Sequence, residues 1–440
     1  MAEIRIDLEL RLSIPDKELN VNSLVFVLKE NMAHIVFKIL EALLHGIEQR
    51  VVARLQKRWP GRYICNGHER NWRQFRTSFG LFRFRFAQLY DRLEQKTLFP
   101  LKKALGVVAY QRILEESLEP AVGLAVHLSY RRSAKEIERI TGSSMAKSSL
   151  HRGLGEFSRL QCQWPNLKKV PYRFLMVDGT GVTIQDGSGH TVGKTRMRWA
   201  LASRGERCPF EPVGFWVDTQ WARIAQDLKA RLDYSKLEVL FSDGGPGIQE
   251  NLLEKAMVHQ RCIWHGKRDF PYLLYADRLK KPHQQPFREK LGAIPAMQLD
   301  KAQLEQLRPE DVPRVKELAD NTRQAFRELI HMLDPSRYPK ARTYIENLSE
   351  HICTFFDWWI EHRQWIPMTT NAVETAFSLV KNRIKHIGRR WTEKGLIDWL
   401  RVTMKKIFFP NTWDNLWKQY LKLNLGLRLI KARATYQWIS

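Results

Sequence analysis

The spacing of hydrophobic residues changes several times along the chain. Residues 3–13 alternate polar and apolar side chains in "EIRIDLELRLS", which predicts a strand. From Val21 to Trp59 apolar residues return every three or four positions, which predicts a long helix that Pro60-Gly61 ends. This helix is a candidate dimer surface, although burial in the core of a monomer would explain the same pattern.

A second alternating segment, "LFRFRF", covers residues 81–86. Phe82, Phe84 and Phe86 are expected on one face of a strand, and Arg83 and Arg85 on the other. The basic face can contact nucleic-acid phosphates or can simply be solvated, and the sequence favours neither interpretation.

Residues 109–160 have a helical pattern with a break in the middle. Ser133 is expected to cap a helix that reaches Thr141, Gly142 makes a turn, and Ser143 or Ser144 caps a second helix. This layout is typical of a DNA-binding helix-turn-helix, but many proteins that do not bind DNA contain it too. The candidate DNA-binding residues of the second helix are Lys147, Ser148, His151 and Arg152.

Strands are predicted after Val170, and helices again after residue 265. "RFLMVDGTGVTI" and "LEVLFSDGGPG" each contain an apolar run that stops at an aspartate, and "HQRCIWHGKRDF" predicts a short strand entering a helix. The pattern therefore predicts an α/β sheet interrupted by about a hundred helical residues, the size of a separate domain.

The expected domain organisation has six parts. They are an N-terminal strand and long helix (1–60), a small β element (61–100), a helix-turn-helix region (101–168), the first part of an α/β core (169–265), an all-helical insertion (266–368), and the second part of the core with basic C-terminal helices (369–440).

The net charge of the chain indicates which kind of partner it binds. The net charge is +25 and the pI is near 9.9, with basic residues spread over the whole chain, which favours a polyanion such as nucleic acid. No apolar run is long enough to span a bilayer, and we see no signal peptide or lipidation motif, so a membrane partner is not expected. The five cysteines do not form a disulfide pattern, which favours a reducing, cytoplasmic location.

Two aspartates share one setting. Asp178 and Asp243 each end an apolar run and each precede a glycine. A buried strand would hold such a carboxylate on a rigid sheet edge, and the glycine would allow close approach of a ligand. Asp-Gly is also a common turn signal, and Asp186-Gly187, which follows no apolar run, is expected to be an ordinary hairpin turn.

The segment 369–390, "TTNAVETAFSLVKNRIKHIGRR", holds a single acid, Glu374. Asn371 could cap a helix with Glu374 three residues later, as in a capping box. Alternatively, Glu374 borders the apolar stripe of the helix beside a basic face and could bind a metal ion. Three carboxylates suit Mg²⁺ or Mn²⁺, and two such ions can drive phosphoryl transfer. The basic residues of this segment that are candidates for DNA binding are Lys381, Arg383, Lys385, Arg389 and Arg390.

The motifs "VDGT", "FSDGG" and "CIWH", followed by the segment 369–390, resemble in this order the DDE transposases of bacterial and archaeal insertion sequences in the Mutator-like superfamily. The resemblance covers about residues 173–390. It implies a ribonuclease-H-like core with a helical insertion, and it makes Asp178, Asp243 and Glu374 the catalytic metal-binding triad.

The same resemblance matches Cys262 and His265 to the C-x-x-H motif of the superfamily, which makes both candidate active-site residues. A buried cysteine and a satisfied histidine would be the ordinary interpretation. A zinc site shared with Cys65 and His68 is less expected, and contact of His265 with the scissile strand, or ordering of the active site, is favoured. Three tryptophans near the insertion are expected in the core, or else stacked on an unpaired base: Trp358, Trp359 and Trp365.

The expected function is that of a DNA transposase in a prokaryotic host, associated with the nucleoid. Two Mg²⁺ ions, or Mn²⁺ in their place, would support cleavage at terminal inverted repeats and strand transfer to target DNA, by at least a dimer. The alternatives are a ribonuclease-H-like nuclease or resolvase without strand transfer, a non-catalytic transposase-derived DNA-binding protein, and an RNA-binding protein.

Overall fold

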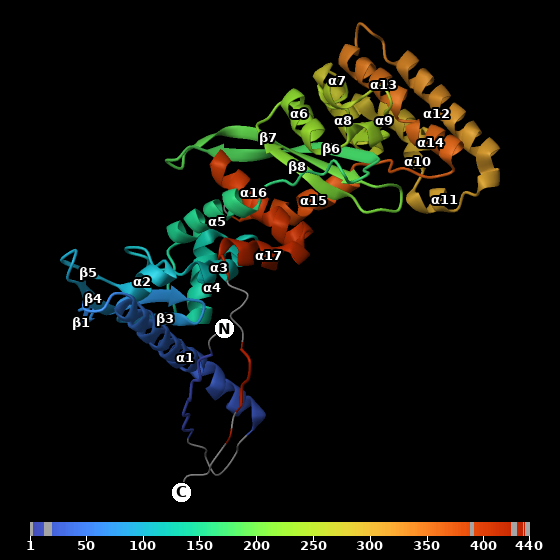
Figure 1. Ribbon diagram of the computed structural model, residues 1–440. Coiled ribbons are helices and arrows are strands. Elements are labelled where there is room, and N and C mark those ends of the chain that lie inside the picture. The colour runs from blue at the N-terminus through green and yellow to red at the C-terminus, as the bar shows by residue number, and fades with distance from the viewer. Residues whose placement is uncertain (1–2, 13–19, 388–390, 424–428, 434, 436–440) are drawn as a thin grey trace. The chain divides into compact units, whose positions relative to one another are not determined.

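The computed structural model describes residues 3–12, 20–387, 391–423, 429–433 and 435 (Figure 1). The chain divides into a first unit, residues 1–161 with 411–440, and a second unit, residues 162–410. Each unit has its own hydrophobic core. In the described part of the chain, no helix is both long and apolar enough to cross a membrane.

The first unit begins with the predicted long helix, α1 (Val21–Arg58). The side chain of Asn20 accepts a hydrogen bond from the Ser23 amide at its start, and the helix ends at Trp59 before Pro60-Gly61, as expected. The predicted strand at 3–13 is wrong over residues 3–12, which form no strand. Alternation alone does not make a strand, because its backbone must pair with a neighbour, and no described strand pairs with these residues.

A small β element follows α1. Strands β1 (Tyr63–His68), β4 (Ala87–Asp91) and β5 (Lys96–Leu98) form one antiparallel sheet, and β2 (Arg73–Thr77) and β3 (Gly80–Phe84) form a hairpin. Phe82, Phe84 and Phe86 are buried together, and Arg83 is exposed, so the predicted division of faces is confirmed. Partly buried side chains of α1 complete this core.

The helical part of the first unit contains α2 (Pro100–Leu105), α3 (Leu118–Ala125), α4 (Tyr130–Thr141) and α5 (Lys147–Gln161). The two predicted helices and the turn at Gly142, whose φ is 66°, are present. Their predicted caps are wrong. Ser129 caps α4, and Ser133 is buried one turn inside it, while α5 begins only at Lys147, after Ser143 and Ser144.

The last helix, α17 (Pro410–Tyr420), belongs almost entirely to the first unit. The Trp417 ring stacks on Phe157 of α5 with centroids 3.9 Å apart, and Trp413 Nε1 donates to Glu119 Oε1 at 2.6 Å. Residues 369–440 are expected to complete the α/β core, whereas α17 clusters with the first unit from Asn411 onward. The tryptophans that draw α17 to α5 are visible in the sequence, but their partner is not.

The second unit is built on a mixed five-stranded sheet in the order β10-β9-β6-β7-β8. Its strands are β6 (Phe174–Gln185), β7 (Thr191–Ser203), β8 (Glu211–Val217), β9 (Val239–Ser242) and β10 (Val258–Arg261). Strand β7 is antiparallel to β6 and β8, whereas β6, β9 and β10 are parallel. The predicted mixture of strands and helices is confirmed, and Asp186 lies in the β6–β7 turn as expected.

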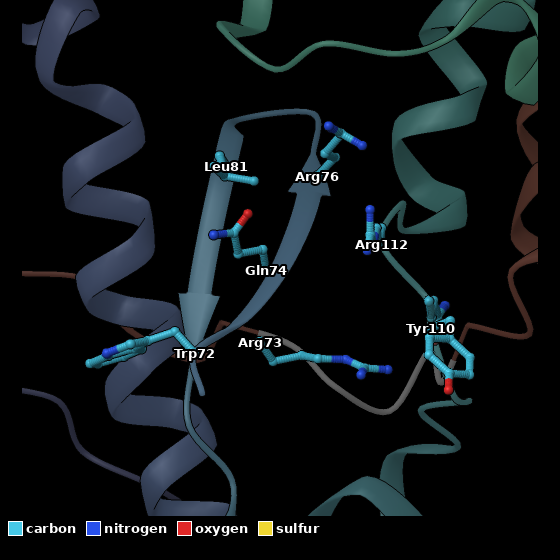
Figure 2. Close-up of a pocket in the computed structure, with 8 residues that line it drawn as sticks. Trp72, Arg73, Gln74, Arg76, Leu81, Tyr110 and Arg112 are labelled. Carbon is cyan, nitrogen blue, oxygen red and sulfur yellow. The ribbon is translucent and has the colours of Figure 1, made fainter. Parts of the chain in front are cut away.

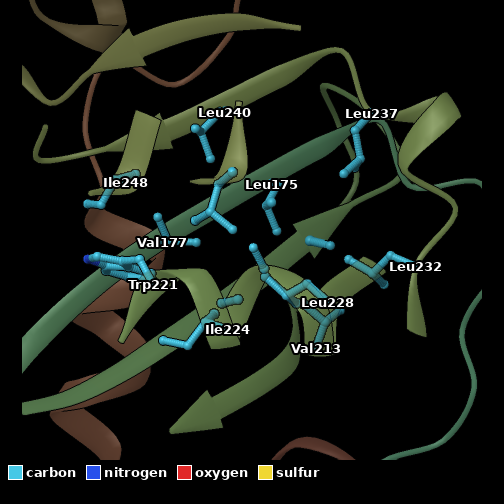
Figure 3. Close-up of a cluster of buried hydrophobic side chains, with 14 of the residues drawn as sticks. Leu175, Val177, Val213, Trp221, Ile224, Leu228, Leu232, Leu237, Leu240 and Ile248 are labelled. Atoms are coloured by element: carbon cyan, nitrogen blue, oxygen red, sulfur yellow. The ribbon is translucent and has the colours of Figure 1, made fainter. Parts of the chain in front are cut away.

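Helices cover both faces of this sheet. On one face, Leu175 and Val177 pack against α6 (Trp221–Arg231) and α7 (Ile248–Leu252) in the cluster that Figure 3 shows. On the other face, Trp199 of β7 contacts Phe377 of α15 (Asn371–Lys381), with ring centroids 5.1 Å apart. A strand buried on both faces needs apolar side chains at every position, which explains the continuous apolar runs.

The described residues between β10 and α15 contain helices, 3₁₀ turns and loops. Trp358 and Trp359 are buried there, so the prediction that they belong to the core is confirmed, and their stacking on a base is not supported. The helices of the second unit not yet named are α8 (Ile263–Ala276), α9 (Gln285–Ala293), α10 (Pro295–Gln298), α11 (Lys301–Glu305), α12 (Val312–Met332), α13 (Pro339–His351), α14 (Thr354–His362) and α16 (Glu393–Phe408).

Candidate active site

Asp178 lies in the middle of β6, which corrects the prediction that it ends a strand. The parallel pairing of β6 with β9 stops at Met176, while the pairing with β7 continues to Gln185. The apolar run therefore ends where β6 loses one neighbour and not where the strand ends. Asp178 is only 4% exposed, and the Gly179 amide donates to its Oδ1 at 2.6 Å.

Asp243 follows β9 directly, as the sequence predicts. The next residue, Gly244, has a φ of 73°, and a Cβ there would collide with the guanidinium of Arg261. Arg261 also donates to the backbone oxygen of Asp243 at 2.9 Å, and the Gly245 amide donates to the Asp243 carboxylate at 2.8 Å. The two glycines thus let this loop turn tightly behind the carboxylate.

Glu374 lies in the first turn of α15. The predicted capping box is absent, because the N-cap residue is Thr370 and no side chain caps the helix. Asn371 is instead the first helical residue. The Glu374 carboxylate turns toward α8, with Oε1 at 3.7 Å from Nε2 of His265. The cap interpretation of this lone acid is therefore wrong.

Cys262 and His265 join the start of α8 to the start of α15. The Thr370 amide donates to Sγ of Cys262 at 3.4 Å, and the Thr370 hydroxyl lies 3.4 Å from Nδ1 of His265. Burial raises the pKa of the Cys262 thiol, which keeps it neutral. Cys262 therefore helps to hold the two helix ends together, while Nε2 of His265 is left facing Glu374.

Three side chains from distant parts of the sequence meet here. One ligand atom each from Asp178, His265 and Glu374 lies within 4.8 Å of the others. Among the described residues this is the one such group of three or more, and it does not include Asp243, Cys262, Cys65 or His68.

The electrostatics of this cluster favour a cation. Burial, followed by the charge of Asp243, raises the pKa of Asp178 to about 7, and Glu374 adds to this effect. Burial and the nearby Arg268 lower the pKa of His265, so its ring is neutral at pH 7. Two carboxylates and a neutral imidazole are a donor set that fits a divalent metal ion.

Two basic side chains lie next to the acids. The charge of Arg268 lowers the pKa of Asp178, and Arg268 follows His265 by three residues on the same helix. Sequence analysis missed Arg268, although this i, i+3 spacing could have indicated it. Lys385 Nζ lies 3.3 Å from the hydroxyl of Thr180, which shares a strand face with Asp178.

The other basic residues of 369–390 differ in exposure. Lys381 is exposed. Arg383 is only 4% exposed, and its guanidinium lies over the rings of Trp391 and Trp399. Its predicted contact with DNA is therefore wrong, because the side chain packs in the core. Arg389 and Arg390 lie outside the described residues.

The candidate DNA-binding residues of the first unit lie at the surface. Lys147, Ser148, His151 and Arg152 are exposed on the first half of α5. Arg83 is exposed on β3, whereas Arg85 is half-buried and donates to the backbone oxygen of Glu69 at 2.9 Å. Their contact with DNA stays a prediction.

Comparisons with known proteins agree with part of these expectations. The model of the family described as Transposase IS66 family matches residues 123–396, more than half of the chain, and that of an uncharacterised protein family, UPF0236, matches residues 14–195. The Drosophila P element transposase in its strand transfer complex is 12% identical, covering 70% of this chain and 94% of its own, with a TM-score of 0.35. No curated protein matches the chain. A TM-score this low does not by itself indicate a shared fold.

Proposed function

Since the chain belongs to the IS66 transposase family, we propose that it cuts the ends of a transposable DNA element and joins them to target DNA. The predicted transposase is confirmed at this level, whereas its placement in the Mutator-like superfamily stays a prediction. The main support for the proposed chemistry is that side chains from β6, α8 and α15 lie within metal-binding distance of one another: Asp178, His265 and Glu374.

The core of the second unit is proposed to be ribonuclease-H-like. Three strands joined by antiparallel pairing are followed by two strands that extend the sheet by parallel pairing on the other side of β6. The helices between β10 and α15 are proposed to be the insertion. This arrangement supports an active site in which two acids come from adjacent strands and the third from a helix.

Asp178, Asp243 and Glu374 are proposed to hold two Mg²⁺ or Mn²⁺ ions. Bound there, the ions would activate a water or a 3′-hydroxyl and stabilise the leaving oxygen of an in-line phosphoryl transfer. Asp243 stands outside the group of closest ligand atoms, but its charge already raises the pKa of Asp178. His265 is proposed to hold Glu374 in place, and Arg268 and Lys385 to bind the phosphates that flank the scissile bond.

The first unit is proposed to bind double-stranded DNA at the inverted-repeat ends. The exposed residues at the start of α5 are of types that contact bases and phosphates, and α5 follows α4 across a short turn. The exposed Arg83 on the small β element would add a phosphate contact.

Dimerisation is proposed through the first half of α1. Its apolar side chains are strongly exposed, Val21 by 73% and Phe26 by 62%, and several others by more than two fifths. Such an uncovered apolar surface is typical of a protein interface, and a second copy of α1 would cover it. Analytical ultracentrifugation of the parent protein and of Phe26→Glu tests this proposal. We expect the mass of a dimer for the parent and a lower mass for the variant, and equal masses would contradict the proposal.

The metal-dependent chemistry is tested with Glu374→Gln on labelled inverted-repeat ends in Mg²⁺ or Mn²⁺. Glutamine keeps the size of the side chain but removes the charge, so we expect cleavage and joining to fall by roughly 10²–10³-fold with DNA binding retained. Glu393→Gln is the matched control, because Glu393 is an exposed first-turn acid of α16. Full activity in Glu374→Gln would show that Glu374 is not a metal ligand. Cleavage without joining of pre-cut ends would favour a nuclease or resolvase.

A further inference from the structure

The hairpin β2–β3 forms one wall of a pocket of about 390 Å³ in the first unit. Figure 2 shows Arg76 near the tip of the hairpin, Gln74 along its face, Trp72 and Arg73 at its base, and Tyr110 and Arg112 on the facing segment. The volume is within the range of small-ligand sites. None of the candidate residues from the sequence lines this pocket.

The lining of the pocket is basic. It contains three arginines and no acid. The Arg76 amide donates to the Arg112 carbonyl at 2.8 Å, so a backbone hydrogen bond joins the two segments that carry these guanidinium groups. The Arg73 guanidinium donates to the Val108 carbonyl at 2.9 Å, which anchors the base of the pocket.

The acids nearest in sequence to the facing segment have other partners. Glu116 accepts a hydrogen bond from the amide of Ser78 at the hairpin tip, and Glu115 accepts from the side chain of Gln111. Neither forms a salt bridge with an arginine of the pocket in the described part of the chain. Arg76 and Arg112 therefore stay available to an anion, and their planar groups suit phosphate oxygens.

The pocket also carries two exposed aromatic side chains. Trp72 is 55% exposed and Tyr110 is 86% exposed, in contrast to the buried Trp358 and Trp359 of the second unit. Tyr110 has a φ of 60°, a conformation that is unfavourable for a residue other than glycine. An exposed ring beside arginines is a surface on which a base can stack.

We propose that this pocket binds one unpaired nucleotide of a DNA strand. Arg76 and Arg112 hold its phosphate, the ring of Trp72 or Tyr110 stacks on its base, and the amide of Gln74 reaches the base edge. In intact duplex the bases are stacked inside and cannot reach such a ring, so the pocket would distinguish frayed or cut ends from uncut DNA. This inference rests on the proposed action on DNA ends.

The test compares the affinity of the full-length protein, by fluorescence anisotropy in EDTA, for a blunt duplex and for the same duplex with a three-nucleotide overhang on either strand. EDTA prevents cleavage, so the result does not depend on the proposed catalysis. We expect the protein to bind a duplex with an overhang more tightly than the blunt duplex. In the double variant Trp72→Ala with Tyr110→Ala, we expect the ratio of these two affinities to fall about tenfold while the affinity for blunt duplex stays unchanged.

Further variants separate stacking from charge and from misfolding. Trp72→Phe with Tyr110→Phe keeps two rings and is expected to keep the preference. Arg76→Gln with Arg112→Gln is expected to reduce it severalfold, whereas Arg92→Gln with Lys103→Gln, which removes the same charge from exposed positions outside the pocket, leaves it unchanged.

Three outcomes would overturn the proposal. They are no overhang preference in the parent protein, an unchanged preference in the Trp72 and Tyr110 variant, and an equal loss for blunt and overhanging DNA. The last would show that the pocket binds duplex backbone. If the parent protein prefers the overhang in EDTA but does not cleave DNA in Mg²⁺ or Mn²⁺, the result counts against the proposed function and not against the nucleotide pocket.

Discussion

In the second unit, Asp178 is only 4% exposed, and Asp243 and Glu374 are close enough to raise its pKa. In the first unit, Arg76 and Arg112 line an open pocket beside exposed rings. Both sites gather charge of one sign, but the acids are held inside a sheet and a helix, and the arginines on a hairpin and a loop.

The difference shows what each site requires. Burial makes the charged form of Asp178 costly, so the acid cluster favours protonation or a bound cation at neutral pH. Arg112 is exposed and Arg76 is half-buried, so both guanidinium groups stay hydrated enough to bind phosphate without a change in protonation. In a chain of net charge +25, a buried acid thus depends on protonation or a bound cation, whereas partly exposed arginines do not.

The largest expected effect separates two aspartates that each precede glycine. We expect Asp178→Asn to slow strand cleavage by roughly 10³-fold, because the amide lacks the charge that a metal ion needs. Asp186→Asn, in the exposed β6–β7 turn, is the control and should change the single-turnover rate by less than about twofold. Equal losses in both variants would remove the distinction between a catalytic and a turn aspartate.

A smaller effect is expected at the cation beside the acids. Arg268 pairs with Asp269 at 2.6 Å and lowers the pKa of Asp178. Arg268→Gln should reduce the cleavage rate by about tenfold. Because it removes a charge that lowers the pKa of Asp178, the increase of the rate with pH should occur at higher pH than in the parent protein. Arg288→Gln, at an exposed position of α9, removes the same charge as a control. An unshifted profile in Arg268→Gln would contradict coupling to Asp178.

The smallest expected effect is on stability. Folding raises the pKa of Asp178 from its ordinary value near 4 to about 7, so the unfolding free energy falls as pH rises between these values. In EDTA, Asp178→Asn should therefore melt about 2–4 °C above the parent at pH 8, with a smaller difference at pH 5. Added Mn²⁺ should raise the melting temperature of the parent more than that of the variant. A difference that does not grow with pH would argue against a buried, costly charge.

Much of the fold could be predicted from local pattern. The long helix α1, the buried phenylalanines of the β element, the strands of the second unit and the helices after residue 265 all follow from periodicity and turn residues. Residues 3–12 form no strand, and α17 clusters with the first unit, because both outcomes depend on which distant segment lies beside each element.

The candidate site divides in the same way. Asp178, His265 and Glu374 could be named from their motifs, and the structure brings these three together. The burial of Arg383 and the part played by Arg268 could not be predicted, because they depend on Trp391 and Trp399 in one case and on the position of α8 beside β6 in the other.

By itself, the sequence determined the basic charge of this protein, the order of most of its helices and strands, and the acids that follow apolar runs. Only the tertiary structure decided that Glu374 faces His265 instead of capping α15, and that Trp72 and Tyr110 are exposed beside three arginines. The physical reason is that periodicity and capping act over a few residues, whereas the burial and the electrostatic environment of a side chain depend on neighbours that only folding supplies.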